Sequence, residues 1–385
     1  MLGYIVRGPL GGLSWSHLQY LLGLADLGHD VYFVEDSGDY QWCCYDPLKN
    51  TMVTDPTYGL QFATHLFARV GLGDCWAYYD AHTSRWLGPC ADRILSICAE
   101  GDLLLNLSGV NPLRPWLMEM PARALVDTDP VFTQIRHLTD QPARSLASQH
   151  TAFFSLGANI SHSRCIIPQD GLPWQATRHP VFLPAWPVTP EVREGKFTTV
   201  MQWDSYPPRE YGGLRYGTKS DSFGPYLDLP QQAGPIFELA IGSSSAPRAL
   251  LVSKGWKVCN PLKPAWTPWR YQHYIQQSKA EFTVAKHGYV ISRSGWFSER
   301  SAAYLATGRP VVTQETGFSD WLEIGAGVMA FNSPDEARAG IEEINSHYAF
   351  HCRAARSIAA EYFDTRKILP ALIERAMHVI PAPAQ

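Results

Sequence analysis

The chain has 385 residues, a formal net charge of -4 and a pI of about 6.3. This length exceeds what a single hydrophobic core usually supports, so we expect two domains. The acidic balance and the lack of a long basic run argue against nucleic-acid binding, and no apolar stretch of about twenty residues predicts a transmembrane helix.

The first residues and the cysteines indicate in which cellular compartment the protein is expected. Residues 1–6 carry no positively charged segment of the kind that opens a secretion signal. The 8 cysteines are scattered, and none forms a Cys-x-x-Cys pair or a His/Cys cluster with zinc-site spacing. We therefore expect a cytoplasmic protein whose thiols are reduced.

The N-terminal part of the chain alternates predicted strands and helices. Strands are predicted over residues 2–6, 30–34, 102–107 and 122–126, and a helix is predicted over residues 14–27. A glycine-rich turn separates the first strand from that helix. Strands that alternate with helices predict an α/β fold with a doubly wound parallel sheet, in which ligands bind beyond the carboxyl ends of the strands.

The middle of the chain predicts a change of domain. Residues 168–195 are rich in Pro and Trp, which neither continue a helix nor suit a central strand, so we expect a crossing between domains. A second series follows, with strands over 197–203, 237–241, 256–259 and 288–292, helices over 249–254 and 271–280, a polar loop over 204–222, and a helical tail over 334–377.

This pattern predicts two Rossmann-like domains that face a cleft. The first is expected over residues 1–180 and the second over residues 181–360. Residues 361–385 are expected to form a C-terminal helix that packs back on the first domain.

The most informative segment covers residues 294–318. Ser298 is a good N-cap, since its hydroxyl can accept a hydrogen bond from a free N–H of the first helical turn. Gly308 can end this helix in the left-handed conformation. Residues 309–313 then resemble a buried parallel strand.

The start of the helix in this segment has the composition of an anion site. Bare backbone N–H groups stand next to the hydroxyls of Ser298 and Ser301 and the guanidinium of Arg300, which together are the parts of a phosphate site. The polar residues 314–317 after the strand offer amide and carboxylate groups that suit sugar hydroxyls. The segment therefore indicates an enzyme that uses a nucleotide sugar.

These features resemble the GT-B glycosyltransferases. Gly11-Gly12, a helix and then Gly28-His29-Asp30-Val31 resemble the opening segment of that group. Residues 298–317 resemble the donor-binding segment of bacterial CgeB-like and family 1-type glycosyltransferases. The resemblance implies transfer of a sugar from a nucleotide-sugar donor, held mainly on the second domain, to a small-molecule or glycan acceptor hydroxyl on the first.

The resemblance and the local chemistry together nominate the site residues. Donor-binding residues are expected to be Gly11, Gly12, Lys219, Lys286, Arg293, Ser298, Glu299, Arg300, Ser301, Gln314, Glu315, Thr316 and Gly317. The catalytic base is expected among His17, Asp127 and Asp129. Because a carboxylate repels a diphosphate, Glu299 is expected to turn away from it or to bind a ribose or sugar hydroxyl.

The sequence favours a reaction without a metal ion, but it does not decide whether the anomeric configuration is retained or inverted. Asp127-Thr128-Asp129 also matches the triplet with which GT-A glycosyltransferases bind a divalent cation, but two Rossmann-like domains favour metal-independent chemistry without a cofactor. Ala303 and Gly295 stand where many retaining GT-B enzymes carry a Glu-x7-Glu pair, and the His-x-Gly-Trp segment of many inverting members is only partly present at Ser294-Gly295-Trp296. Retention or inversion therefore stays open.

Three other functions fit parts of the sequence. A dinucleotide oxidoreductase would use Gly8, Gly11 and Gly12, with Glu35 after the second strand, although these glycines do not have Gly-x-Gly-x-x-Gly spacing. A sugar-nucleotide epimerase or hydrolase would act on the donor alone on the same fold. A non-catalytic nucleotide or glycan binder would bind the donor without transfer.

Overall fold

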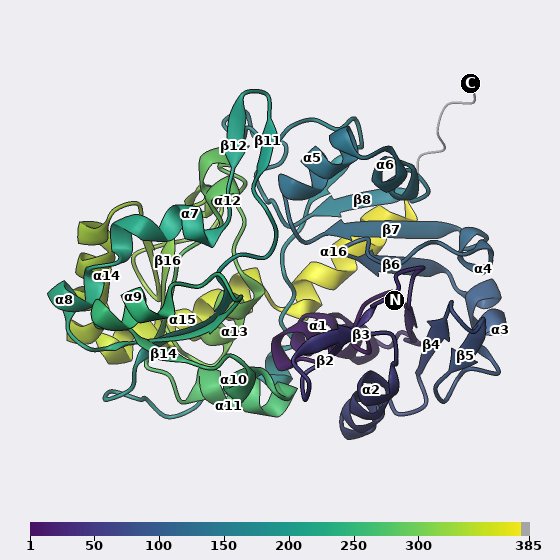
Figure 1. The fold of residues 1–385 in the computed structure, drawn as a ribbon, viewed down its shortest axis with the longest axis horizontal. Helices are drawn as coiled ribbons and strands as arrows, with labels where there is room; N and C mark the ends of the chain where they lie inside the picture. Colours follow the sequence, from purple (N-terminus) through teal and green to yellow (C-terminus); the bar gives the residue numbers. More distant parts are fainter. Residues whose placement is uncertain (379–385) are drawn as a thin grey trace.

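The computed structural model of the protein describes residues 1–378. Figure 1 shows two α/β halves side by side, the N-terminal half in purple and blue and the C-terminal half in green. Each half is built on a sheet whose strands are mostly parallel, so the predicted α/β class with parallel sheets is confirmed.

The main sheet of the N-terminal half has two parts that are joined through a single residue, and a separate hairpin is formed by residues 44–53. Its elements are α1 (Gly11–Asp26), β1 (Phe33–Asp36), β2 (Cys44–Asp46), β3 (Thr51–Val53), α2 (Thr57–Arg69), β4 (Trp76–Asp80), β5 (Arg85–Leu87), α3 (Ile94–Glu100), β6 (Leu103–Leu107), α4 (Pro115–Met118), β7 (Ala122–Asp127), α5 (Phe132–Thr139), α6 (Gln141–Ala147), β8 (Ala152–Ser155) and β9 (Trp174–Ala176). The order β5-β4-β1 continues through Leu2, which bridges Val34 and Asn106, to β6-β7-β8-β9.

The C-terminal half contains one parallel sheet in the order β14-β13-β10-β15-β16-β17. Its elements are β10 (Phe197–Gln202), β11 (Arg209–Tyr211), β12 (Leu214–Tyr216), α7 (Lys219–Phe223), α8 (Leu229–Ala233), β13 (Phe237–Gly242), α9 (Arg248–Ser253), β14 (Lys257–Cys259), α10 (Leu262–Ala265), α11 (Pro268–Gln276), β15 (Ala280–Thr283), α12 (His287–Ser292), α13 (Glu299–Ala306), β16 (Val311–Gln314), β17 (Val328–Phe331), α14 (Pro334–Ser346) and α15 (Tyr348–Tyr362). The last helix, α16 (Thr365–Met377), returns to lie against β6, β7 and β8 of the other half (Figure 1).

Within residues 1–378, two of the predicted strands do not form. Over residues 2–6 only Leu2 forms bridges to neighbouring strands, and the chain bends from residue 5 because the N–H groups of residues 5–7 donate to Glu35 instead. Residues 288–292 lie in α12, where Val290 N–H donates to Lys286 O at 3.3 Å. Short apolar runs do not distinguish a strand from a helix by periodicity alone.

The strand in this part of the chain is instead β15, of which only Ala280 falls within a predicted element, the helix over residues 271–280. The helix α11 stops at Gln276, and Ala280–Thr283 then pairs with both β10 and β16. The predicted loop over residues 204–222 also has internal structure, since it contains the β11–β12 hairpin and the start of α7. Pairing partners far along the chain, rather than local sequence, decide these assignments.

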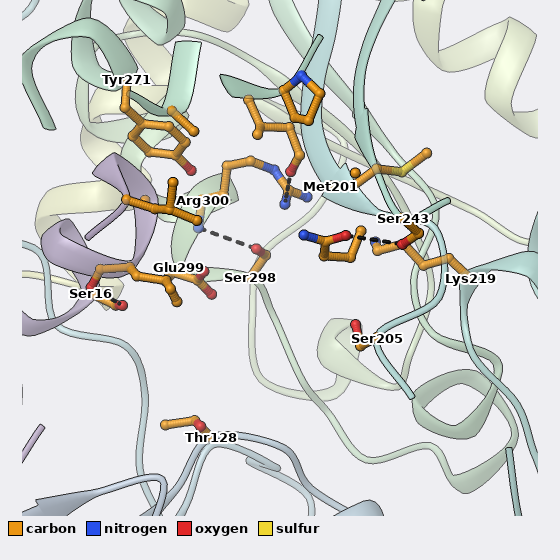
Figure 2. A pocket seen from close by; sticks show the side chains of 18 of the residues that line it. Ser16, Thr128, Met201, Ser205, Lys219, Ser243, Tyr271, Ser298, Glu299 and Arg300 are labelled. Atoms are coloured by element: carbon orange, nitrogen blue, oxygen red, sulfur yellow. Dashed lines mark hydrogen bonds between the residues drawn. The ribbon is translucent and has the colours of Figure 1, made fainter. Parts of the chain in front are cut away.

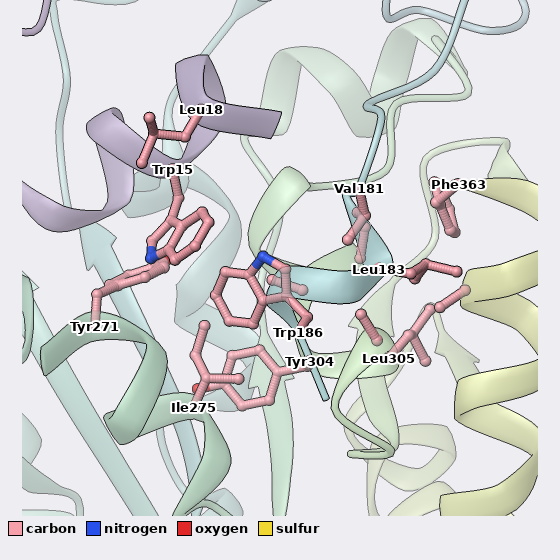
Figure 3. Close-up of a cluster of buried hydrophobic side chains, with 14 of the residues drawn as sticks. Trp15, Leu18, Val181, Leu183, Trp186, Tyr271, Ile275, Tyr304, Leu305 and Phe363 are labelled. Atoms are coloured by element: carbon pink, nitrogen blue, oxygen red, sulfur yellow. The ribbon is translucent and has the colours of Figure 1, made fainter. Parts of the chain in front are cut away.

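The two halves share a buried apolar core. Figure 3 shows Trp15 of α1 beside Trp186 of the crossing segment and Tyr304 of α13. The ring centroids of Trp15 and Trp186 lie 4.8 Å apart, and Trp15 Nε1 donates to Pro268 O at 2.8 Å. This core holds α1 and α13 in a fixed relation to each other, which positions groups from both halves around one site.

Gly11 permits the closest approach between the halves. A Cβ at this position would lie 2.4 Å from Thr267 O, at the start of α11. We predict that Gly11→Ala lowers the free energy of unfolding by about 1–3 kcal/mol, because the helices must separate to relieve the overlap. Chemical denaturation measures this change, and Gly224→Ala is the control, since a Cβ there would meet nothing within 4 Å. Equal stability of the two variants would contradict the prediction.

Candidate functional site

A cavity of about 1220 Å³ lies between the two halves. The N-terminal half contributes α1, the β2–β3 hairpin and the loops after β6 and β7. The C-terminal half contributes the carboxyl ends of β10, β13 and β14 and the amino end of α13. A drug-sized ligand usually needs about 300–1000 Å³, so this cavity has room for two reactants.

Lys219 provides a buried cation in the wall of the C-terminal half. It is the first residue of α7, which Thr218 and Asp221 stabilise as a capping box, and its Nζ donates to Val284 O just beyond β15. Burial, followed by the nearby charge of Arg300, lowers the pKa of Lys219 to about 7. Figure 2 shows Lys219 and Ser243 on one side of the cavity, with Ser16 and Glu299 on the other. An anion bound near Lys219 would favour its charged form.

The amino end of α13 has the predicted cap. Ser298 Oγ accepts a hydrogen bond from Arg300 N at 3.2 Å, and Gly308 adopts a φ of 77° after the helix. Ser298 and Glu299 line the cavity. Because the first N–H groups of a helix carry partial positive charge, this end of α13 suits a phosphate group.

Arg300 lines the same cavity, but its guanidinium is held inside the protein. Nε lies 2.5 Å from Glu281 Oε1, one terminal nitrogen donates to Val200 O at 2.8 Å, and the other donates to Thr283 Oγ1 at 2.8 Å. Burial acts to lower the pKa of Arg300, but the surrounding acidic groups, of which Glu281 has the largest effect, together outweigh burial and raise the pKa. The side chain therefore ties α13 to β10 and β15.

Asp129 and Lys286 join the halves at the cavity wall. Lys286 Nζ lies 2.8 Å from Asp129 Oδ1 and 2.7 Å from the hydroxyl of Tyr206. Tyr206 donates to Asp129 Oδ2 at 2.5 Å, and Tyr289 also donates to Asp129. The carboxylate and the ammonium are thus both engaged by protein partners, although Asp129 and Lys286 line the cavity.

His17 lies at the cavity, but both of its ring nitrogens are used. Nδ1 lies 2.7 Å from Leu13 O, and Nε2 accepts the Tyr4 N–H at 3.2 Å, an arrangement that fits the neutral ring. Burial lowers the pKa of His17 to about 4. The structure therefore leaves His17 no lone pair for an acceptor proton, contrary to what its position in the sequence suggested.

Asp127 does not reach the cavity. Its carboxylate is buried and accepts hydrogen bonds from Thr133 Oγ1, Gln134 Nε2, Ser155 Oγ and the backbone N–H of Asp129. Burial raises the pKa of Asp127, and these donors oppose the rise. Its contacts organise the turn after β7, which carries Thr128 and Asp129 into the cavity wall.

Several other predicted donor residues lie outside the cavity wall. Arg293 pairs with Asp320 at 3.3 Å, the buried Ser301 faces the interior, and Gly11 packs against α11. The polar residues after β16 have internal partners as well, because each bonds to a neighbouring loop or to its own turn; these are Gln314, Glu315, Thr316 and Gly317. The structure brings together Gly12, His17, Asp129, Lys219, Lys286, Ser298, Glu299 and Arg300 in the cavity wall.

Residues at three strand ends were missed. Gln202 is the last residue of β10, Ser243 and Ser244 follow β13, and Asn260 follows β14; all four line the cavity. The rule that doubly wound sheets bind ligands at the carboxyl ends of their strands could have found them, since all three of these strands were predicted. The sequence alone did not show that these three strands are neighbours in the sheet.

Three findings bear on the alternative function, on metal binding and on membrane crossing. Glu35, the acid needed for a dinucleotide site, is buried and accepts the N–H groups of Ile5, Val6 and Arg7 at 2.6–2.7 Å, so a ribose does not reach it. Within residues 1–378, no cluster of three or more His, Cys, Asp or Glu side chains is placed to hold a metal ion. None of the helices in that range has both the length and the apolar character that crossing a membrane requires.

Comparison with known proteins adds structural neighbours. No family model and no curated protein matches the sequence. An alpha-glucosyltransferase in complex with UDP-glucose and DNA containing an abasic site is 10% identical with a TM-score of 0.60, over 97% of this chain and 98% of that chain. HepE of Anabaena in complex with UDP-glucose is 14% identical with a TM-score of 0.56, over 97% of both chains.

A third structural neighbour is also a glycosyltransferase. AviGT4, a glycosyltransferase involved in avilamycin A biosynthesis, is 13% identical with a TM-score of 0.52, over 97% of this chain and 95% of that chain. All three are GT-B glycosyltransferases, and the match extends over both halves. The chain therefore has the GT-B fold, which confirms the predicted fold class.

Proposed function

We propose that the protein is a glycosyltransferase that moves a sugar from a nucleotide-sugar donor to an acceptor hydroxyl. The observation that carries this proposal is the cavity between the halves, where a buried ammonium and a capped helix start stand beside the carboxyl ends of parallel strands. Structures of the same fold are described in complex with UDP-glucose or UDP, which supports a nucleotide-sugar donor.

In this proposal the donor lies on the domain of residues 181–360. The polar groups after β13 and β14, including Ser243 and Asn260, would contact the base and ribose. The diphosphate would lie between Lys219 and the first turn of α13. Lys219 and the helix end would offset the charge of the departing diphosphate, which supports hexosyl transfer without a metal.

The acceptor would lie on the domain of residues 1–180, which the helix within residues 361–385 completes. The cavity residues from this domain, all within the described chain, include no Lys or Arg. A wall without cations supports a small-molecule or glycan acceptor rather than a nucleic acid, whose phosphates require them. The proposal includes that the protein is a bacterial, CgeB-like enzyme that acts in the cytoplasm.

Turnover of a panel of nucleotide sugars tests this function. The protein is incubated with UDP-, GDP-, dTDP- and ADP-sugars, and release of the nucleoside diphosphate is measured with water as the acceptor. We expect turnover only with donors that carry one particular base, since a single site would contact the base. Release of a nucleoside diphosphate from none of these donors would contradict the proposal, and formation of an epimerised nucleotide sugar would favour an epimerase.

A further inference from the structure

One carboxylate in the cavity wall has no hydrogen-bond donor. The two acidic side chains that line the cavity are Asp129 and Glu299. Asp129 is engaged by Lys286, Tyr206 and Tyr289, whereas Glu299 accepts no hydrogen bond from any residue of the described chain. Its side chain is 40% exposed and reaches toward α1, so it does not turn away from the cavity.

Two buried polar groups of the opposite half lie near this carboxylate and also lack partners. His179 is 7% exposed, and its Nε2, which has no hydrogen-bond partner within residues 1–378, lies 3.7 Å from Glu299 Oε2. The hydroxyl of Tyr20, on α1, is equally buried and unpartnered among those residues. Buried polar groups are rarely left unsatisfied, so a ligand that bonds to them is expected here.

The cavity wall of the N-terminal half also carries several hydroxyl groups. The Tyr4 hydroxyl lies 3.3 Å from Ser108 Oγ, which lies 2.6 Å from Thr128 Oγ1. Ser16 adds a further hydroxyl from α1. Such a surface complements a neutral molecule with several hydroxyl groups, because each hydroxyl both donates and accepts.

We propose that Glu299 is the catalytic base that takes the proton from the acceptor hydroxyl, and that His179 is a positioning residue that orients Glu299 toward a neutral, polyhydroxylated acceptor. This inference rests on the proposed function and names the acceptor side of that site. It replaces the three bases expected from the sequence, since His17, Asp127 and Asp129 each have their acceptor atoms occupied.

The transfer step balances with this assignment. The acceptor O–H bond breaks and its proton goes to the Glu299 carboxylate, while the oxygen lone pair forms a bond to the anomeric carbon. The bond from that carbon to the phosphate oxygen breaks, and its electron pair leaves with the nucleoside diphosphate. A single displacement of this kind inverts the anomeric configuration. With water as the acceptor, the same step hydrolyses the donor.

Several ionisable groups face Glu299. They come from all the elements around it and are Tyr4, Tyr20, His179, Lys219, Tyr271 and Arg300. The carboxylate is the form of Glu299 that can accept the proton of the acceptor hydroxyl. An N–H from His179 orients that carboxylate, so its loss is expected to lower kcat while the KM for the donor changes little.

Donor hydrolysis by purified variants tests the inference. We expect Glu299→Gln to lower kcat at least about 100-fold, as loss of a general base does, while the thermal shift caused by the nucleoside diphosphate stays unchanged. Glu323→Gln is the matched control on the exposed surface and should keep wild-type kcat. A kcat for Glu299→Gln within twofold of wild type would overturn the proposal.

His179 and the product anomer provide independent readouts. His179→Phe should lower kcat with little change in the KM for the donor, and His179→Gln, which keeps an N–H donor, should restore kcat. Proton NMR of the freshly released sugar should show inversion, and retention would overturn the assignment of a base. If wild-type protein neither binds a nucleoside diphosphate nor hydrolyses any donor, the proposed function fails and this inference falls with it. Wild-type turnover with unaffected Glu299 variants refutes the inference alone.

Discussion

Replacing Lys219 with methionine is expected to weaken binding of a nucleoside diphosphate by about 10- to 100-fold. The buried ammonium lines the cavity, and a charge-assisted hydrogen bond contributes about 1.5–3 kcal/mol. Isothermal titration calorimetry at pH 6.5 measures the affinity. The matched control is Lys367→Met on α16, where the lysine pairs with Glu361 on the surface and should not affect binding. Equal affinities for both variants would remove Lys219 from the diphosphate site.

Binding should also be linked to protons through Lys219. The pKa of Lys219 is lowered to about 7, so most of this side chain is neutral at pH 8 in the free protein and charged at pH 6. A bound diphosphate favours the charged form, which predicts uptake of up to about one proton at pH 8 and little at pH 6. Calorimetry in two buffers with different ionisation enthalpies measures the uptake. The difference between wild type and Lys219→Met isolates it from protons that the phosphate exchanges.

The same shift predicts how stability depends on pH. The folded protein binds fewer protons at Lys219 than the unfolded chain does between pH 7 and the ordinary value of 10.5. The contribution of Lys219 to the free energy of unfolding therefore increases as the pH rises through that range, and the cost of burying the ammonium is fully present below pH 7. Lys219→Met should remove this contribution and flatten the pH dependence measured by denaturation.

Arg300→Ala is expected to lower the free energy of unfolding by about 3–5 kcal/mol. Glu281 is 0% exposed, and the substitution leaves its buried carboxyl group without its partner. It also removes the donors to Val200 O and Thr283 Oγ1, which connect α13 with β10 and β15. Chemical denaturation measures the loss.

Two further variants make this result interpretable. Arg338→Ala breaks an exposed pair with Glu342 and should change stability by less than about 1 kcal/mol. Arg300→Met with Glu281→Gln removes both charges and should recover part of the loss, because no unpaired charge stays buried. An Arg300→Ala protein with wild-type stability but without nucleotide binding would instead assign the guanidinium to the diphosphate, as the sequence alone suggested.

The elements predicted correctly are those with strong local signals. The helix α13 begins after Ser298 and ends before Gly308 as expected, because an N-cap and a closing glycine act on the residues next to them. β7 and β13 were also found, since apolar runs of buried strands are evident locally. The strand β15 was missed because its identity depends on pairing with β10, more than eighty residues earlier in the chain.

The site was only partly predictable for the same reason. The sequence located the amino end of α13 and nominated Lys219, and both lie in the cavity wall. The sequence could not show that Arg300 forms an ion pair with the buried Glu281, or that the backbone N–H of Tyr4 donates to Nε2 of His17. Whether a side chain is free to bind a ligand depends on partners that only the folded chain brings together.

The central claim is that a nucleotide binds in the cavity between the halves, and a thermal-shift screen against nucleoside diphosphates tests it most directly. At 100 times its Kd a ligand stabilises the folded state by about 2.7 kcal/mol, which corresponds to a rise in Tm of several degrees. The account predicts such a rise with the diphosphate of one base in wild-type protein and a much smaller rise in Lys219→Met. A Tm unchanged by every nucleoside diphosphate, or raised equally in both proteins, would contradict it.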